Sequence, residues 1–286
     1  MEVLKLSNGV KMPLEGYGVF QIEDKEMCKN GVLNAIKSGY RLIDTAASYL
    51  NEEAVGEAIK QAIDEGIVTR EELFITTKLW VQDYSYEKAK IGFEKSIEKL
   101  GLSYIDLYLL HQPYGDSYGA WKALEELYRE GKIRAIGVSN FNKCRFTEFA
   151  EVVDVKPMVN QVELHPFFSQ YDLIEVMKEY GCQPQAWGPL TEGKHNIFNH
   201  PVLKEIGDKY GKTPAQVALK WNVQRGVSII PKSVHLDRIK ENINIWDFEL
   251  SDDDMKKIDT LDTGKSEIID HNDLAIIKFI LGHRID

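Results

Sequence analysis

Short apolar runs alternate with longer amphipathic stretches along most of the chain. Each run has the length of a strand and is followed by a polar loop and, in most cases, by a stretch with helical periodicity. The eight runs cover residues 14–20, 40–43, 73–77, 105–110, 133–138, 158–162, 183–187 and 227–230. Helices are predicted between them, among others at 51–65, 86–100, 117–130 and 213–225. The seventh run is polar and contains Pro184, so only the count and spacing of the runs assign it as a strand.

Residues with known preferences for helix ends support these boundaries. Asn51 is followed by two glutamates, which predicts that its side chain caps a helix N-terminus. Gly101, Gly131 and Gly181 each follow a helical pattern, at the position where a left-handed residue ends a helix.

The alternation of strands and helices predicts parallel strands joined by crossover helices. Eight such units in 286 residues fit an α/β fold of the (β/α)8 barrel type better than an open sheet. Asn8-Gly9 separates two short alternating runs near the start, which predicts an N-terminal β-hairpin. Because the sequence shows no linker or low-complexity tract, residues 1–286 are expected to form a single barrel domain.

Composition narrows the class of protein. The chain has 35 Lys and Arg against 45 Asp and Glu, a net charge of −10, and 43% hydrophobic residues, as in ordinary globular enzymes. The acidic balance argues against nucleic-acid binding. The three cysteines lack paired spacing, which is typical of a reducing compartment. The sequence shows neither a signal-peptide pattern nor an apolar run long enough to cross a membrane. We therefore expect a cytoplasmic protein without membrane association. No metal-ligand spacing is present, so no metal site is expected.

Several common cofactor and nucleophile motifs are missing from the sequence. Gly16-Tyr17-Gly18 lacks the third glycine of a dinucleotide-binding fingerprint, and Gly211-Lys212-Thr213 has Ile206 where a phosphate-binding loop needs glycine. Neither a zinc-protease nor a serine-hydrolase motif occurs. The sequence therefore gives no support to a Rossmann, P-loop, zincin or serine-hydrolase function.

Polar residues follow or end three consecutive apolar runs at matched positions. Asp44, Lys78 and His111 are 34 and 33 residues apart, so they are expected at one rim of the barrel. The active sites of such barrels lie at the carboxyl ends of the strands. Neighbouring strands are about 4.8 Å apart, which brings these side chains into one cleft. Tyr49 is five residues beyond Asp44 in the same loop and is expected to lie over them.

These four side chains suit the protonation of a carbonyl oxygen. A phenol has an ordinary pKa near 10, and an adjacent ammonium is expected to lower that pKa toward neutral pH. A carboxylate keeps the ammonium charged, and an imidazole can orient the oxygen on which charge develops. Because no side chain delivers a hydride, a nicotinamide cofactor is implied.

Each of these residues also has a plainer interpretation when taken alone. Asp44 alone would be interpreted as a turn residue, and Lys78 as a solvent-exposed lysine. His111 and Tyr49 alone would be interpreted as buried side chains whose polar atoms are hydrogen-bonded within the fold. Four such residues at matched positions favour the catalytic interpretation. Asp106, inside an apolar run, is expected to have a structural hydrogen-bonding role, and the other histidines have no ligand spacing and receive no role.

The segments around these residues resemble the aldo-keto reductase family. Its signature segments are similar to RLIDTAASY (41–49), ITTKLW (75–80), LYLLH (107–111), GVSNF (137–141), NQVE (160–163) and IPKS (230–233). The resemblance extends in order from the hairpin to about Gly264 and is strongest to the bacterial 2,5-diketogluconate and glyoxal-type reductases. It implies NADPH-dependent reduction of aldehydes or ketones to alcohols.

The resemblance also implies a role for each matched residue. Tyr49 is expected to be the general acid/base, with Lys78 and Asp44 as its tuning pair, while His111 orients the substrate carbonyl. The residues expected to bind the cofactor are Ser139, Asn140, Gln161 and Trp187 at the nicotinamide, Gly188, Pro189 and Leu190 at the pyrophosphate, Lys232, Ser233 and Arg238 at the 2′-phosphate, and Glu241 and Asn242 near the adenine. Two cations and a hydroxyl suit a dianionic phosphate, which favours NADPH over NADH. Trp187 stands where many members have Tyr.

The substrate is expected to be a small carbonyl compound. Val19, Trp80 and His111 are the expected contacts, and the short tail from about Lys265 predicts an open pocket. The resemblance implies a monomer. One alternative function is a cofactor-sensing binding protein with negligible turnover, and a weaker one is an isomerase or lyase on the same barrel.

Overall fold

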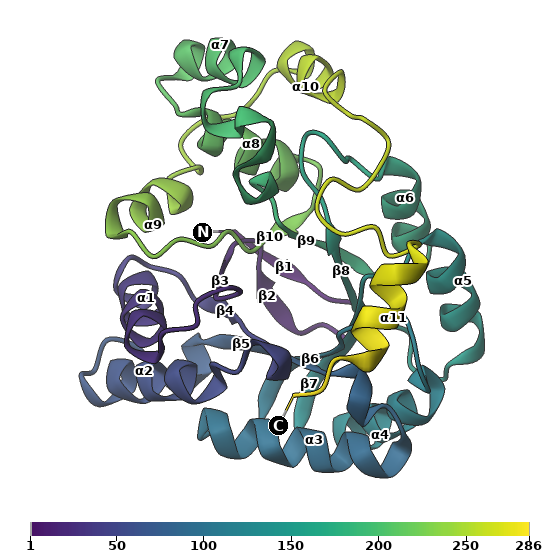
Figure 1. The fold of residues 1–286 in the computed structure, drawn as a ribbon. Helices are drawn as coiled ribbons and strands as arrows, with labels where there is room; N and C mark the ends of the chain where they lie inside the picture. Colours follow the sequence, from purple (N-terminus) through teal and green to yellow (C-terminus); the bar gives the residue numbers. More distant parts are fainter. Residues whose placement is uncertain (1, 286) are drawn as a thin grey trace.

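Eight parallel strands surround the centre of the computed structural model, which describes residues 2–285 (Figure 1). They are β3 (Gly16–Gly18), β4 (Leu42–Asp44), β5 (Phe74–Leu79), β6 (Ile105–Leu110), β7 (Ile133–Ser139), β8 (Val159–Glu163), β9 (Gln183–Trp187) and β10 (Ser228–Ile229). The strands pair in chain order. A bridge between Glu15 and Ile229 brings the last strand back to the first. The predicted (β/α)8 barrel is confirmed, and its polar seventh run is a strand.

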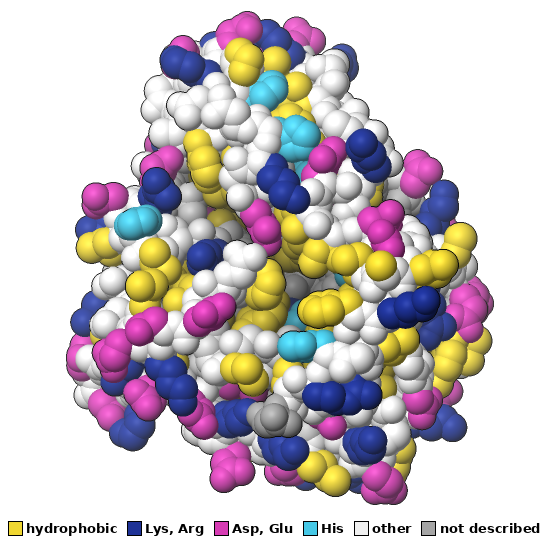
Figure 2. All heavy atoms as spheres, viewed as in Figure 1, with side chains coloured by type: hydrophobic (Ala, Val, Ile, Leu, Met, Phe, Trp, Pro, Cys, Tyr) yellow, Lys and Arg dark blue, Asp and Glu magenta, His cyan; other side chains and the backbone are white. Residues whose placement is uncertain are grey.

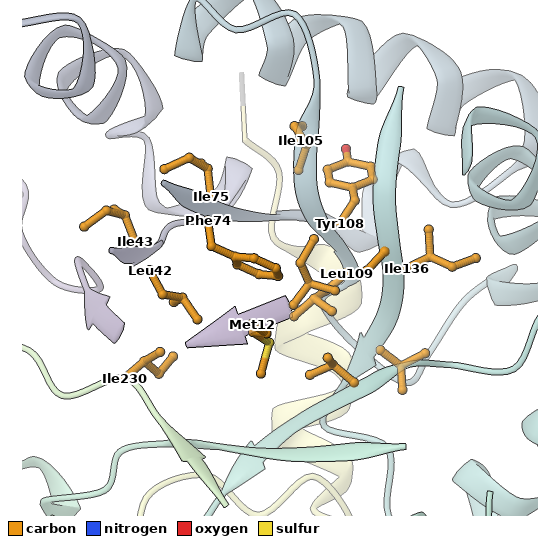
Figure 3. Close-up of a cluster of buried hydrophobic side chains, with 14 of the residues drawn as sticks. Met12, Leu42, Ile43, Phe74, Ile75, Ile105, Tyr108, Leu109, Ile136 and Ile230 are labelled. Atoms are coloured by element: carbon orange, nitrogen blue, oxygen red, sulfur yellow. The ribbon is translucent and has the colours of Figure 1, made fainter. Parts of the chain in front are cut away.

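The predicted hairpin closes one end of the barrel. Its strands, β1 (Val3–Lys5) and β2 (Lys11–Pro13), are antiparallel, and Gly9 has a φ of +86° in the turn. Met12 is fully buried and lies near Leu42, Phe74 and Leu109 inside the barrel (Figure 3). Leu42 and Phe74 are the first residues of β4 and β5. The hairpin therefore covers the amino end of the barrel, which leaves the carboxyl end for a site.

Helices surround the strands (Figure 1). They are α1 (Lys25–Lys37), α2 (Glu52–Asp64), α3 (Tyr86–Leu100), α4 (Ser117–Arg129), α5 (Lys143–Val152), α6 (Tyr171–Glu179), α7 (Pro201–Tyr210), α8 (Pro214–Gln224), α9 (Leu236–Ile243), α10 (Asp252–Asp259) and α11 (Leu274–Gly282). Gly101, Gly131 and Gly181 have φ values of +63°, +76° and +65°, which confirms the predicted left-handed helix ends.

Asn51 precedes α2, but the prediction that its side chain caps this helix was wrong. Its Nδ2 donates to the carbonyl oxygens of Val19 (3.0 Å) and Ile22 (3.3 Å), and its Oδ1 accepts from Thr45 Oγ1 (2.8 Å). The side-chain amide of Asn51 therefore bonds to residues outside the helix and not to the N–H groups of its first turn. Asn51 therefore fastens the loop after β3 to the rim of the barrel.

A row of buried polar side chains crosses the barrel interior. Gln161 donates through Nε2 to Asp44 Oδ2 (2.7 Å) and Gln185 Oε1 (2.8 Å), and Gln185 donates to Ser228 Oγ (3.2 Å). Each of these residues is at most 2% exposed. Because a buried polar group needs a partner, polar residues in β9 and β10 complete a network that begins at Asp44. This network explains why the seventh strand is polar.

Asp106 of β6 has the predicted structural role. Its buried carboxylate accepts from Arg70 (2.7 Å), Arg134 (2.6 Å) and the backbone N–H of Ile75 (2.9 Å). A carboxylate in an apolar strand is stable here because two guanidinium groups and an amide satisfy it.

Glu163, at the end of β8, binds the segment that leads to α11. Its buried carboxylate accepts from Ser266 Oγ (2.7 Å) and from the backbone N–H groups of Glu267 (2.8 Å) and Ile268 (3.1 Å). The C-terminal segment is therefore held on the carboxyl rim of the barrel.

The last residues of the tail contact the rim near β5. The indole N–H of Trp80 donates to His283 O (3.0 Å), and Gln82 and Ile285 exchange two hydrogen bonds of 2.8 Å. Figure 1 shows α11 crossing the end of the barrel on the way to these contacts. The tail, although short, folds back onto the rim, so it lies over one side of the predicted open pocket.

Charged groups are scattered over the outer helices, whereas apolar side chains gather around a hollow near the centre of the face in Figure 2. Between residues 2 and 285 no helix is long and apolar enough to cross a membrane. Over the same range no group of three metal-ligating side chains occurs.

Glu15, which pairs with Ile229 where the last strand meets the first, gives the stability of the protein a dependence on pH that can be measured. Burial raises its pKa from the ordinary 4.5 to about 8, although Trp246 donates to its Oε2 at 3.0 Å. Between these pH values the unfolded chain loses a proton that the folded protein keeps, so the free energy of unfolding falls as pH rises across this window. Relative to Glu15→Gln, the wild type should lose on the order of 3 kcal/mol there, measured by denaturant unfolding. Equal pH dependence in both proteins would contradict the buried, protonated state.

Candidate active site

The four residues predicted to act together meet at the carboxyl rim. Asp44 ends β4, Lys78 lies near the end of β5, and His111 follows β6, while Tyr49 ends a short 3-10 helix, η1 (Ala47–Tyr49). Lys78 Nζ donates to Asp44 Oδ1 (2.5 Å), Thr45 O (2.9 Å) and Tyr49 Oη (3.2 Å). The Tyr49 and His111 rings are 5.5 Å apart. Asp44, Tyr49, Lys78 and His111 are called the tetrad below.

Lys78 and Asp44 form a buried ion pair. Their side chains are 0% and 2% exposed. Burial acts to lower the pKa of Lys78, but Asp44 and Tyr49 raise it, with the increase larger, so the ammonium stays charged. Burial raises the pKa of Asp44 against the opposing effects of Lys78 and Gln161. The three hydrogen bonds of Nζ use all of its protons, so its charge is directed at the carboxylate and the phenol.

Tyr49 keeps its proton in this environment. Burial raises the pKa of the phenol, Lys78 lowers it and Asp44 raises it, with a net increase. The ammonium therefore acts in the expected direction, but burial and the carboxylate together outweigh it. A protonated phenol is the form that can donate to a carbonyl oxygen.

His111 is a neutral imidazole held on several sides. Burial lowers its pKa well below 6.5, and Lys78 and His271 lower it further. Its Nδ1 lies 3.2 Å from Ser48 Oγ, and its ring is 5.3 Å from that of Trp80. When Ser48 donates to Nδ1, the proton of the imidazole is on Nε2. Ser48 was not predicted to belong to the site, although its position directly before Tyr49 in the same loop indicates that its hydroxyl lies near the reacting groups.

On the substrate side of the rim, Val19 is fully buried, and its contact with a substrate stays a prediction. The neighbouring Phe20 is 45% exposed, and its ring is 4.9 Å from that of Tyr49. Trp80 does face His111, and its other neighbour is the ring of His283 at 5.8 Å. The residue at the mouth is therefore Phe20, and His283 joins it from the tail.

Residues predicted at the nicotinamide are bonded to one another. Asn140 Nδ2 donates to His111 O (3.0 Å) and Ser139 Oγ (3.2 Å), and Ser139 Oγ donates to Gln161 O (2.8 Å). The indole N–H of Trp187 donates to Asn140 Oδ1 (2.8 Å). Since Gln161 uses both Nε2 protons within the barrel, its Oε1 is the atom available to a ligand donor.

Trp187 and Asn140 of this cluster line a cavity of about 300 Å³ beneath the C-terminal segment. Asn140, Glu163, Trp187 and His271 are among its lining residues, and no member of the tetrad is. The ring of His271, which received no role from the sequence, is 6.5 Å from that of Trp187. The cavity therefore adjoins the predicted nicotinamide end and lies away from the reacting groups.

The loop after β9 bends sharply and is covered by the C-terminal segment. Gly188 has a φ of +59°, and a Cβ there would lie 2.9 Å from Ile268 Cδ1. Pro189 and Leu190 lead into another 3-10 segment, η4 (Thr191–Asn199). In η4, Nε2 of His195 lies 3.0 Å from Oε2 of Glu267. A glycine is therefore required by the backbone and by the segment packed on it.

Residues predicted at the adenosine end gather at the start of α9. Lys232 and Arg238 are exposed, and neither forms an ion pair with a carboxylate in residues 2–285. Ser233 and Asn242 are buried. Glu241 is partly buried, and its carboxylate accepts from Thr213 Oγ1 (2.6 Å). Two uncompensated cations beside a hydroxyl provide a basic patch on an acidic protein, which suits an anionic ligand.

The buried pair can be tested without a substrate. Asp44→Asn leaves the Lys78 ammonium buried without its carboxylate, which should lower the free energy of unfolding by about 3–5 kcal/mol. The Asp44→Asn/Lys78→Met double variant removes both charges and should recover much of this loss, as measured by denaturant unfolding. A single variant as stable as the wild type would mean that the two groups are not a charged pair in the folded protein.

Comparisons with known proteins identify the family of this chain. Residues 16–263 match the profile of the aldo/keto reductase family. Glyoxal reductase of Bacillus subtilis is 51% identical over 261 residues, covering 91% of this chain and 92% of that protein. Methylglyoxal reductase DkgA of Escherichia coli is 44% identical over 266 residues, covering 92% and 94%.

Solved structures give the same result. An aldo-keto reductase from a Medee basin deep-sea metagenome library has a TM-score of 0.90 and 39% identity, covering 95% of this chain and 99% of that one. The Bombyx mori aldo-keto reductase in complex with NADP has a TM-score of 0.90 and 32% identity, covering 97% and 96%. Together with the family match, these findings show that the chain belongs to the aldo/keto reductase family of oxidoreductases.

Proposed function

We propose that this protein reduces aldehydes or ketones to alcohols with NADPH. The observation that carries the proposal is the Lys78 ammonium, buried and bonded at once to Asp44 and to the hydroxyl of Tyr49. The neutral His111 lies against the same tyrosine. This arrangement can donate a proton to a carbonyl oxygen and stabilise the charge that develops on it.

In the proposed reaction, the tetrad acts directly or through Lys78 on the carbonyl oxygen. Bound NADPH, held by the residues named below, would supply the hydride that reduces the carbonyl carbon. Tyr49 gives its proton to the oxygen, and Lys78 stabilises the resulting phenolate. Asp44 keeps Lys78 charged and in position. His111 donates from Nε2 to the same oxygen, for which its neutral state with Nδ1 held by Ser48 is suited.

The donor and acceptor groups fit the proposed cofactor. A nicotinamide carboxamide carries two N–H protons, and Gln161 Oε1 is an acceptor whose own amide is already engaged in the barrel. Trp187 offers a ring face beside Ser139 and Asn140. The uncompensated charges of Lys232 and Arg238 suit a 2′-phosphate. Gly188, Pro189 and Leu190 would hold the pyrophosphate under the C-terminal segment, with Glu241 and Asn242 near the adenine.

The rim also suggests the size of the substrate. Phe20 and Trp80 provide apolar walls, and the tail contact at His283 restricts the space beside them. Relatives named glyoxal reductase and methylglyoxal reductase support short carbonyl compounds as substrates. We therefore propose small aldehydes and α-dicarbonyls as the substrate class.

Tyr49→Phe separates catalysis from cofactor binding. Loss of the hydroxyl should lower kcat for methylglyoxal reduction by about a hundredfold or more, because no other group gives a proton to the oxygen. The dissociation constant for NADPH, measured by quenching of tryptophan fluorescence, should stay the same. An unchanged kcat would remove Tyr49 from the mechanism. A wild type that binds NADPH but shows no turnover on a panel of carbonyl compounds would instead favour the cofactor-sensing binding protein.

Lys232→Ala and Arg238→Ala test the phosphate pocket. Each should weaken NADPH binding by roughly tenfold or more, since a charge-assisted hydrogen bond to the 2′-phosphate is lost. NADH has no 2′-phosphate, so its dissociation constant should change little. Lys240→Ala, an exposed cation on the same helix, is the matched control. Equal losses for the two cofactors would contradict the assignment.

A further inference from the structure

Two buried tyrosines reach from the barrel to the segment that carries Ser233 and Arg238. Tyr17 of β3 donates from its hydroxyl to Ser233 O (2.6 Å). Tyr40, just before β4, donates to Ile239 O (3.1 Å), and its hydroxyl also interacts with the buried side chain of Glu15. The rings are at most 1% exposed and pack edge to face, 6.0 Å apart. The two accepting carbonyls therefore lie at the two ends of residues 233–239.

Gly31, in the middle of α1, makes room for the first of these bonds. A Cβ at this position would lie 2.5 Å from the hydroxyl of Tyr17. Glycine disfavours a helix interior, so its presence there needs a packing reason. The ring of Tyr17 is enclosed in the core and has no space to withdraw. The path of the hydroxyl to Ser233 O therefore depends on the missing side chain of Gly31.

The segment between the two anchors is held to the core at its ends by the buried Ser233 and Ile239, and Val234 packs against the same core. Its exposed middle has fewer polar contacts: Ser233 Oγ accepts from the backbone N–H of His235 (3.1 Å), and α9 begins without a side-chain cap. Lys232 and Arg238 extend from it into solvent without a carboxylate partner in residues 2–285. Flexible cations bind a phosphate well only if the backbone beneath them is held in place. The hydroxyls of Tyr17 and Tyr40 are groups that hold it.

We propose that Tyr17 and Tyr40 are positioning residues that fix residues 233–239 and thereby determine the preference for NADPH over NADH. This inference rests on the proposed role of Lys232, Ser233 and Arg238 at the 2′-phosphate. Neither tyrosine touches the reacting atoms, so their effect is on cofactor selection and not on the chemical step.

The test compares Tyr17→Phe and Tyr40→Phe with the wild type in binding NADPH and NADH, each measured by quenching of tryptophan fluorescence. Each variant should raise the dissociation constant for NADPH by about fivefold, the effect of one lost hydrogen bond, with NADH changed less than twofold. The value of kcat at saturating NADPH should stay the same. Tyr108→Phe is the matched control, because this fully buried hydroxyl lies on β6 beside Ser96 and makes no hydrogen bond to residues 233–239. It should leave the ratio of the two constants unchanged.

A second set of variants tests the contact directly. Gly31→Ala should displace the Tyr17 hydroxyl and reproduce the selective loss of NADPH affinity. In the Tyr17→Phe background the same change should have no further effect, because the nearest remaining ring atom, Cζ, is 3.6 Å from the new Cβ. Additive losses would overturn this account of Gly31.

The outcomes separate this inference from the proposed function. A wild type that prefers NADPH, with tyrosine variants that keep the full preference or lose both cofactors equally, would overturn the positioning role alone. A wild type with no preference for NADPH would overturn the phosphate pocket, and the positioning role with it.

Discussion

The buried charge pair of Lys78 and Asp44 is the constraint on which the rest of the site depends. An ammonium inside a barrel is tolerated only when oxygen atoms surround it, and here Asp44, Thr45 and Tyr49 supply them. The second oxygen of Asp44 then requires a donor, which Gln161 provides. Gln161 in turn requires Gln185, so one charge at the rim accounts for polar side chains on strands far away along the chain.

The ion pair of Lys78 and Asp44 also affects the protonation of Tyr49 and His111, the two side chains proposed to contact the substrate oxygen. Burial and the ammonium act in opposite directions on Tyr49, so the phenol keeps its proton in the resting protein yet has a cation ready to stabilise its conjugate base. For His111 burial and the ammonium act in the same direction, and both favour the neutral ring. The charge on Lys78 therefore leaves Tyr49 as the proton donor and His111 as a neutral group that only donates a hydrogen bond.

Much of the barrel and the tetrad could be predicted because both depend on local pattern. Apolar runs of strand length place Asp44, Lys78 and His111 at strand ends, and parallel strands bring those ends to one rim. The errors concern contacts over longer distances. Asn51 has the residue type of a cap but bonds to Val19 and Ile22, and the tail is short in sequence yet reaches Trp80. Such outcomes depend on which partners the folded chain brings near, which periodicity does not record.

The attachment of the tail at Trp80 and Gln82 has a practical consequence for handling this protein. The two hydrogen bonds between Ile285 and Gln82 hold the end of the described chain on the rim, close to Trp80 and the apolar walls of the cleft. A purification tag or surface tether at that end would compete with small molecules for access. One joined ahead of the hairpin would leave from the opposite end of the barrel, where no reacting group lies.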